Sequence, residues 1–320
     1  MNRHHPSKPA LVSPVPWTDS FLFEFHGVAL ASRASPSVAL LNATRYTSKT
    51  RSSWHWFLIH DPIAVDLLIS TRDGGTLMTV FVLVHGAWHG MWAWDRVTPL
   101  LHQAGARTVM PTLTLDGDAG LHLHADEVVA ALDGLAGDRD QARGAADDVI
   151  LVGHSYAGLV VRQAADLRPH LVSHIVLFDG WAGGDGHSLF DLAPDSLVTA
   201  ARAAAEARGG GTTVPAPPPG AFGITDSADA AWLADRLIPQ PLRTFTEPTR
   251  LTGAVDKIPG TGVYCRPMTY PFDRFADELG YRSIPLDAPH NVMLSHPEAV
   301  ARLLLQAADD LDYENEKLER

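Results

Sequence analysis

Short apolar runs alternate with longer stretches of helical periodicity from Thr79 onward, and this alternation restricts the fold more than any other feature of the sequence. The run TVFVLVH (79–85) is rich in β-branched residues and is followed by glycine, which is typical of a strand buried on both faces. Five further runs have strand character: 107–111, 148–153, 174–180, 261–267 and 281–287. Helical stretches fall at 91–105, 122–137, 155–169, 273–280 and 296–311. This succession predicts an α/β fold with a mainly parallel sheet and helices on both faces.

One segment interrupts the alternation between Gly180 and Gly253. It contains an alanine-rich helical stretch (196–208), a loop rich in glycine and proline (209–220) and a second helical stretch (227–238), with no convincing strand. A helical insertion late in an α/β sheet is typical of a lid over the strand ends, where ligands bind in such folds. We therefore predict a helical cap at about 181–252.

Residues 1–77 differ in composition from the rest of the chain. They are rich in Pro, Ser, Thr and Arg, and basic side chains outnumber acidic ones there, whereas acidic side chains dominate from Met78 onward. The most apolar piece carries Glu24 and His26, which does not fit the uncharged core of a signal peptide. We predict a poorly ordered extension over 1–77 and an α/β domain over 78–320.

Charge and cysteine content narrow the function classes. The chain has 37 acidic and 25 basic residues, a formal net charge of −12, which argues against nucleic acid or an anionic membrane as partner. No apolar run approaches the roughly 18 residues of a membrane span. Cys265 is the single cysteine, which excludes an intrachain disulfide and fits a cytoplasmic location. Nothing in the pattern predicts an oligomeric state.

Ser155 is the predicted nucleophile. It lies in Gly153-His154-Ser155-Tyr156-Ala157, between a strand-like run and a helical stretch. This is the context of a nucleophile elbow, in which a strained turn presents the serine hydroxyl above the sheet. The usual pattern is G-x-S-x-G, and alanine replaces the last glycine here, which is still small enough for the close approach of strand and helix.

A serine nucleophile needs a base, and position selects it among 16 histidines. In this architecture the order along the chain is Ser, then Asp or Glu, then His, with the histidine on the loop after the last strand. His290 lies there, after the run that ends near Leu286. His296 precedes Pro297 at a helix start, where a surface or capping role is expected.

The oxyanion of an acyl-transfer intermediate is usually bound by two backbone N–H groups. The first is expected from Tyr156, which follows the nucleophile, and the second from Ala87 in the loop after the first strand of the domain. Gly86 allows that loop to turn tightly. The neighbouring Trp88 is a candidate wall of the substrate pocket.

Three stretches together carry a family resemblance: VLVHGAWHGMWAWDRV (82–97), VGHSYAGLVV (152–161) and DAPHNVMLSHPEAVARLL (287–304). They resemble the small α/β-hydrolases of the plant methylesterase and hydroxynitrile lyase branch and their bacterial esterase-like relatives, over about residues 79–310. The resemblance implies a six-stranded parallel core. It also implies Ser155 and His290 as catalytic residues and Ala87 and Tyr156 as oxyanion donors.

The triad acid is where the sequence departs from this family. Members usually carry an Asp just past the strand that corresponds to TGVYCRP (261–267), but here the loop has no carboxylate before Asp273. Asp179, at the end of the preceding strand, preserves the order Ser, Asp, His, and some lipases of this fold place the acid there. Asp179, Asp273 and the lack of a working acid all remain open at this point.

The predicted function is a serine hydrolase that cleaves a carboxylic ester of a small, apolar molecule through an acyl-enzyme, without cofactor or metal. His85 and His89 lie on a glycine-containing loop, and His122 and His124 would point to different sides of a helix, so neither pair predicts a metal site. A binding protein without turnover is the alternative. A hydroxynitrile lyase is disfavoured because the plant lyases have a threonine where this chain has Gly86.

Overall fold

Six parallel strands form the central sheet of the protein, as the sequence predicts. The computed structural model describes residues 70–72, 75–77, 79–142 and 148–318. The strands are β3 (Val80–Val84), β4 (Arg107–Val109), β5 (Val149–His154), β6 (His174–Phe178), β9 (Gly260–Arg266) and β10 (Arg282–Asp287). Their order across the sheet is β10-β9-β6-β5-β3-β4, and every neighbouring pair is parallel.

The strand residues divide between two hydrophobic cores because successive side chains point to opposite faces of a sheet. In β3, Val80, Val82 and Val84 lie in one buried cluster, whereas Phe81 and Leu83 lie in the other. The same alternation holds in β5 and β6. Both faces of the sheet are therefore covered, which explains why its strands read as continuous apolar runs.

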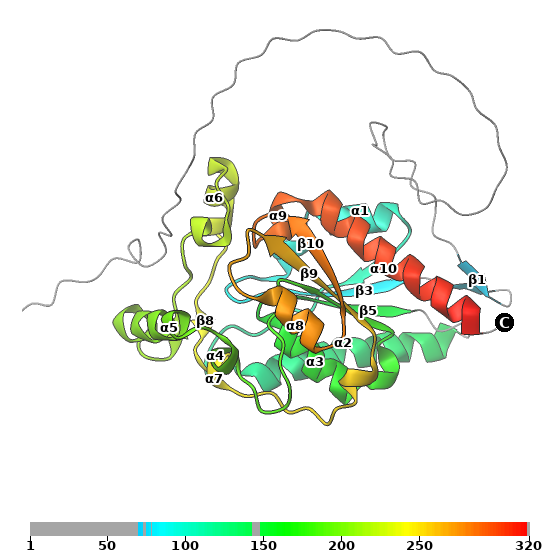
Figure 1. The fold of residues 1–320 in the computed structure, drawn as a ribbon, viewed down its shortest axis with the longest axis horizontal. Helices are drawn as coiled ribbons and strands as arrows, with labels where there is room; N and C mark the ends of the chain where they lie inside the picture. The colour runs from blue at the N-terminus through cyan, green and yellow to red at the C-terminus, as the bar shows by residue number, and fades with distance from the viewer. Residues whose placement is uncertain (1–69, 73–74, 78, 143–147, 319–320) are drawn as a thin grey trace, which may run out of the picture. The chain divides into compact units, whose positions relative to one another are not determined.

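Helices cover each face of the sheet (Figure 1). One face carries α2 (Leu121–Ala142), α3 (Ala157–Leu167) and α8 (Phe272–Glu278). The other carries α1 (Thr98–Gln103), α9 (Val292–Ser295) and α10 (Pro297–Leu318). Short 3-10 turns are η2 (Met91–Trp94), η3 (Pro169–Leu171) and η5 (Val255–Lys257).

The segment between β6 and β9 forms the predicted helical insertion. Its elements are α4 (Leu189–Leu192), α5 (Asp195–Arg208), β7 (Thr213–Val214), η4 (Pro219–Phe222), α6 (Ser227–Ala234), β8 (Gln240–Pro241) and α7 (Arg243–Thr246). The expectation that it contains no strand is wrong in detail, because β7 and β8 form an antiparallel pair. Each strand spans only two residues, too few to produce a recognisable alternation in the sequence.

The predicted extension over 1–77 lies mostly outside the described residues. Its last part contains a two-stranded antiparallel pair, β1 (Ser70–Arg72) and β2 (Gly75–Leu77). Whether residues 1–77 form a poorly ordered extension, and whether the domain begins at Met78, stay predictions.

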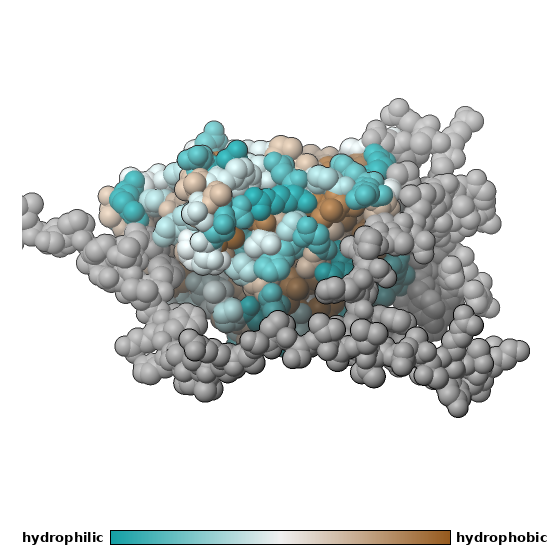
Figure 2. All heavy atoms as spheres, turned by 90° about the horizontal axis from the view of Figure 1, so that it is seen from above, coloured by the Kyte–Doolittle hydropathy of each residue, from teal (hydrophilic) through white to brown (hydrophobic). Residues whose placement is uncertain are grey.

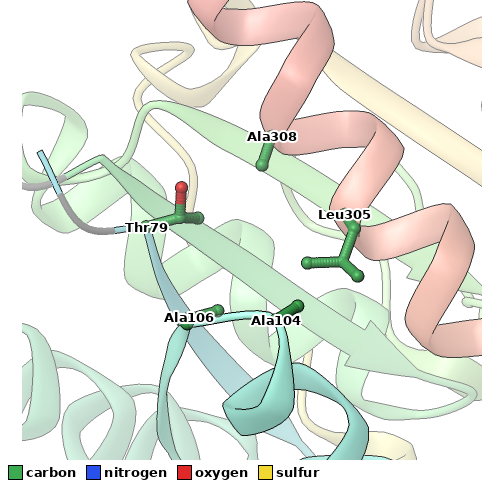
Figure 3. A pocket seen from close by; sticks show the side chains of 6 residues that line it. Thr79, Ala104, Ala106, Leu305 and Ala308 are labelled. Atoms are coloured by element: carbon green, nitrogen blue, oxygen red, sulfur yellow. The ribbon is translucent and has the colours of Figure 1, made fainter. Parts of the chain in front are cut away.

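A small cavity lies at the amino ends of the strands, between the residue before β3, the turn after α1, and α10 (Figure 3). Its lining residues are Thr79, Ala104, Gly105, Ala106, Leu305 and Ala308. Its volume of about 10 Å³ gives room for about one water molecule. Because all strands of the sheet are parallel, it lies at the opposite end of the sheet from Ser155, which follows β5.

The visible surface in Figure 2 is mainly hydrophilic among the described residues, with apolar side chains scattered between polar ones. The large apolar side chains that are exposed are Met91, Leu123, Leu167, Ile238 and Met268. Of the helices that the structure describes, none has both the length and the apolar character needed to cross a bilayer.

Candidate active site

Ser155 occupies a strained turn at the carboxyl end of β5. Its φ is +54°, in the left-handed region that non-glycine residues rarely adopt. The turn is tied to the neighbouring strand end, since Ser155 N–H donates to Phe178 O (3.0 Å) and Trp181 N–H donates to Ser155 O (3.0 Å). Helix α3 begins two residues later, at Ala157. The local structure is the strand, turn and helix of a nucleophile elbow.

Two glycines allow the elbow to close. A Cβ at Gly153 would lie 2.9 Å from Ala157 O, and a Cβ at Gly158 would lie 2.4 Å from Trp181 O. Both are backbone contacts that cannot move aside. The backbone contacts that require glycine are therefore at positions 153 and 158. This explains why alanine is tolerated at 157, where the usual G-x-S-x-G motif has glycine.

Asp179 and His290 are brought together by the ends of β6 and β10. His290 Nδ1 donates to Asp179 Oδ2 at 2.9 Å, and Cys265 N–H of β9 donates to Asp179 Oδ1 at 2.7 Å. Asp179 is 2% exposed and has a φ of +43°, so the chain holds this carboxylate in a strained and enclosed position. Both carboxylate oxygens therefore have a donor, as a buried anion requires.

The competing acid, Asp273, lies in the first turn of α8. Within the described residues it forms no hydrogen bond with His290. Its neighbour Phe272 contacts the imidazole instead, with ring centroids 5.8 Å apart and planes 16° from parallel. Of the two candidates, the structure places Asp179 in contact with His290.

The His290 ring is nearly parallel to two aromatic rings. One is Phe272 of α8, and the other is Phe222 of the cap, at 6.5 Å and 12°. These contacts limit rotation of the ring, whose side chain is 13% exposed. The sequence contains no local signal for either contact, because both residues come from distant segments.

His154, the residue before Ser155, contacts His290. Its Nε2 donates to His290 O at 3.0 Å, and the two ring centroids are 4.7 Å apart. Burial, together with the nearby His290, lowers the pKa of His154 well below its usual value, so its imidazole is neutral. The sequence offered a signal here, since His154 occupies the x position of the elbow motif, but its role was not predicted.

Ser155 and His290 form no direct hydrogen bond in the part of the chain that the structure describes. Among the described residues, Ser155 Oγ has no hydrogen-bond partner, and the link between the two loops runs through His154. Catalytic hydrogen bonds of this kind are often long in a free enzyme and tighten when substrate binds.

The predicted oxyanion loop lies against the elbow. A Cβ at Gly86 would lie 2.8 Å from His154 Nδ1 and 3.1 Å from Ser155 Cβ, so only glycine allows this approach. Within the described residues, neither the N–H of Ala87 nor that of Tyr156 donates to a protein acceptor. Free, enclosed donors beside a serine are what an oxyanion site requires.

His89 and Asn291 connect the oxyanion loop to the His290 loop. His89 Nδ1 donates to Ala87 O at 2.6 Å, and Asn291 Nδ2 donates to His89 Nε2 at 3.0 Å. Burial lowers the pKa of His89 to about 3, which keeps the ring neutral and able to accept from Asn291. Two hydrogen bonds through the His89 ring therefore join the two loops.

Trp88, the predicted wall of the pocket, fixes the cap to the core. Its φ is +65°, its N–H donates to Gln240 Oε1 (2.8 Å), and its indole Nε1 donates to Val214 O (3.0 Å). Its ring makes edge contacts with Phe222 and Phe245 of the cap. The structure thus places Trp88 between the oxyanion loop and the cap.

The match to known families is extensive. The model of a family described as "Alpha/beta hydrolase family" matches residues 81–303. The chain belongs to the alpha/beta hydrolase family. This match and the six-stranded sheet confirm the predicted fold class.

Known relatives and solved structures agree with the resemblance. The carbendazim-hydrolysing esterase of Nocardioides sp. is 29% identical over 249 residues, which cover 71% of this chain and 98% of the esterase. Methylesterase 9 of Arabidopsis thaliana is 34% identical over 99 residues, 30% of this chain and 38% of the relative. An extracellular α/β-hydrolase from a Paenibacillus species has a TM-score of 0.63 at 24% identity, over 72% of this chain and 98% of that one. The predicted resemblance to methylesterases, a hydroxynitrile lyase and bacterial esterase-like proteins is confirmed.

Buried histidines predict a pH-dependent stability. Burial lowers the pKa from 6.5 to about 4 for His85, about 3 for His89 and about 4 for His174. The unfolded chain takes up protons on these groups near their ordinary pKa, whereas the folded chain keeps them neutral. The free energy of unfolding is therefore unaffected by these groups above pH 6.5, and it decreases as the pH falls toward 4.

We expect each of these groups to lower the free energy of unfolding by about 1.4 kcal/mol per pH unit within this window. Urea unfolding followed by circular dichroism at about pH 7 and about pH 5 measures the loss. The variant His174→Phe, remote from Ser155, should show a smaller loss. An unfolding free energy that is equal at the two pH values would contradict the expectation.

Proposed function

We propose that the protein is a serine esterase that cleaves carboxylic esters of small, largely apolar molecules through an acyl-enzyme. The observation that carries the proposal is the 2.9 Å hydrogen bond from His290 to the enclosed Asp179, beside Ser155 in its strained turn. The esterase among the relatives supports the same reaction class.

In this mechanism Ser155 Oγ attacks the ester carbonyl carbon, and His290 Nε2 takes the hydroxyl proton. Asp179 holds His290 in the Nδ1–H tautomer, which leaves Nε2 free to accept, and stabilises the imidazolium that forms. The N–H groups of Ala87 and Tyr156 bind the oxyanion of the tetrahedral intermediate. His290 then gives its proton to the departing alkoxide.

Deacylation repeats these steps with water. His290 removes a proton from the water as it attacks the acyl carbon, and returns that proton to Ser155 Oγ as the acid leaves. The Tyr156 hydroxyl lies apart from these transfers, since it is 3.0 Å from His124 Nδ1 and burial raises its pKa well above the usual value. The proton transfers of the whole cycle therefore involve Ser155, His290, the departing alkoxide and water, and do not involve Tyr156.

The two alternatives have less support. The binding-protein alternative arose because no carboxylate precedes Asp273 in the loop after 261–267, and the contact of Asp179 with His290 weakens that reason. The lyase alternative would need a hydroxyl side chain on the oxyanion loop, but a Cβ added at Gly86 would lie 2.8 Å from His154 Nδ1 and 3.1 Å from Ser155 Cβ, which leaves no space for one.

Burst kinetics test the proposal. Excess p-nitrophenyl acetate should release one equivalent of p-nitrophenol per chain rapidly and then more slowly, with an acetyl group found on Ser155 by mass spectrometry. Chain denatured by heat is the control. An acetyl or phosphonate label on Ser155 without any steady release would favour the binding protein, and cleavage of mandelonitrile without ester hydrolysis would favour the lyase.

A further inference from the structure

A second cavity, much larger than the first, lies beside His290. Its volume is about 650 Å³, and it is open to solvent. Its lining comes from three parts of the chain: the cap (221–226 and Asp229), the end of β9 and the residues after it (266, 267 and 269), and the end of β10 and the residues after it (287–290, 295 and 296). The volume lies within the range of about 300–1,000 Å³ typical of sites for small organic ligands.

The cavity is next to one particular catalytic group. Among the described residues to which the proposed function gives a role, His290 lines this cavity, whereas Ser155, Ala87 and Tyr156 do not. It therefore lies on the side of the site where His290 is, and none of the groups that would bind the carbonyl carbon and its oxygen lines it.

The chemistry of ester cleavage decides what lies on that side. When the tetrahedral intermediate collapses, the bond between the carbonyl carbon and the alcohol oxygen breaks, and the proton on His290 Nε2 passes to that oxygen. The alcohol must therefore be next to His290, while the acyl oxygen remains at the N–H groups of Ala87 and Tyr156.

We propose that this cavity is the subsite for the leaving alcohol, and that the protein acts on esters of bulky aryl alcohols about the size of a two-ring aromatic system. This inference rests on the proposed function. It differs from a methyl ester specificity, because methanol would leave nearly all of the 650 Å³ unfilled.

The walls nearest His290 suit an aromatic group. Phe222 lies parallel to the imidazole at 6.5 Å, and Ile224 and Pro289 add apolar surface. Gly223 packs directly on Pro289, where an added Cβ would lie 2.5 Å from the proline Cβ. This contact brings the cap against the His290 loop and makes one continuous wall. Such surroundings favour binding of an aromatic ring, because they bury its apolar area and offer contacts with another ring.

Polar side chains border the rest of the cavity. Asp226 caps α6 through the N–H groups of Ala228 and Asp229, and Asp229 pairs with Arg96. These carboxylates are thus already engaged in holding α6. Arg96 also donates to Leu294 O at 2.9 Å, which fixes α6 to the segment after His290. These contacts therefore join two walls of the cavity, α6 and the segment after His290, to each other.

Filling the cavity tests the proposal. Thr269 is exposed and lines the cavity, so Thr269→Trp should occupy space that an aryl alcohol needs without touching the catalytic groups. Met268→Trp is the matched control, because Met268 is the neighbouring residue, is also exposed, and is absent from the lining.

Ethyl acetate and 2-naphthyl acetate form the same acetyl-enzyme and differ only in the alcohol. The quantity to compare is the ratio of kcat/KM for the naphthyl ester to kcat/KM for the ethyl ester. We expect Thr269→Trp to lower this ratio at least about tenfold, and Met268→Trp to leave it near the wild-type value. Equal effects of Thr269→Trp on both esters would overturn the subsite while the esterase activity remained. Hydrolysis of neither ester by the wild type would overturn the proposed function, and the subsite with it.

Discussion

Replacing Ser155 with alanine should lower kcat for p-nitrophenyl acetate by about a thousandfold to a millionfold, to the level that binding and the oxyanion donors alone provide. The reason is that the change removes the atom that forms the acyl bond, so His290 and Asp179 retain their contact but have no nucleophile to activate. Stability should change little, because Ser155 Oγ has no hydrogen-bond partner among the described residues.

The measurement is the steady-state rate together with labelling by a fluorophosphonate, which should disappear in Ser155→Ala. Ser173→Ala is the matched control, since Ser173 donates to Asp148 at the other end of the sheet and should keep the wild-type rate. A rate in Ser155→Ala above a tenth of the wild-type value would show that another group carries the ester hydrolysis.

The sheet, Ser155 and His290 could be predicted because their signals are local. Buried parallel strands read as unbroken apolar runs, and β3, β5 and β6 are such runs. A nucleophile elbow needs small residues within a few positions of the serine, and the two glycines that the structure requires are Gly153 and Gly158. His290 follows from strand order, since it comes directly after the last strand.

The carboxylate that contacts His290 could not be chosen from the sequence because the choice depends on the register between strands. Phe178 pairs with Val263, which places Asp179 opposite the end of β9, where the N–H of Cys265 holds one carboxylate oxygen. No pattern within either strand records this alignment. The contacts of Phe222 and Phe272 with His290 were missed for the same reason, since they join segments that the sequence leaves far apart.

Asp179→Asn gives the sharpest test of the acid, because asparagine has nearly the same shape. Cys265 N–H requires an acceptor, so the amide oxygen should take the place of Oδ1 and leave the amide NH₂ facing His290 Nδ1. His290 must then accept at Nδ1 and carry its proton on Nε2, the tautomer that cannot take the proton of Ser155. We expect kcat to fall by about a hundredfold to ten-thousandfold, in line with a triad whose histidine is held in the wrong tautomer.

Asp273→Asn is the control, and its kcat should stay within about twofold of the wild type, since Asp273 makes no hydrogen bond with His290 within the described residues and its replacement leaves the contact of His290 with Asp179 intact. Rates for both variants should be measured from pH 6 to pH 10 with about the same ionic strength, because a base held in the wrong tautomer recovers part of its activity only when hydroxide replaces it. A large loss in Asp273→Asn with near-normal rates in Asp179→Asn would mean that the helix carboxylate reaches His290 during turnover. Comparable large losses in both would mean that the two carboxylates act on His290 at different steps. The expected result, a loss confined to Asp179→Asn, would place the acid directly after β6, beside the strand that leads to Ser155.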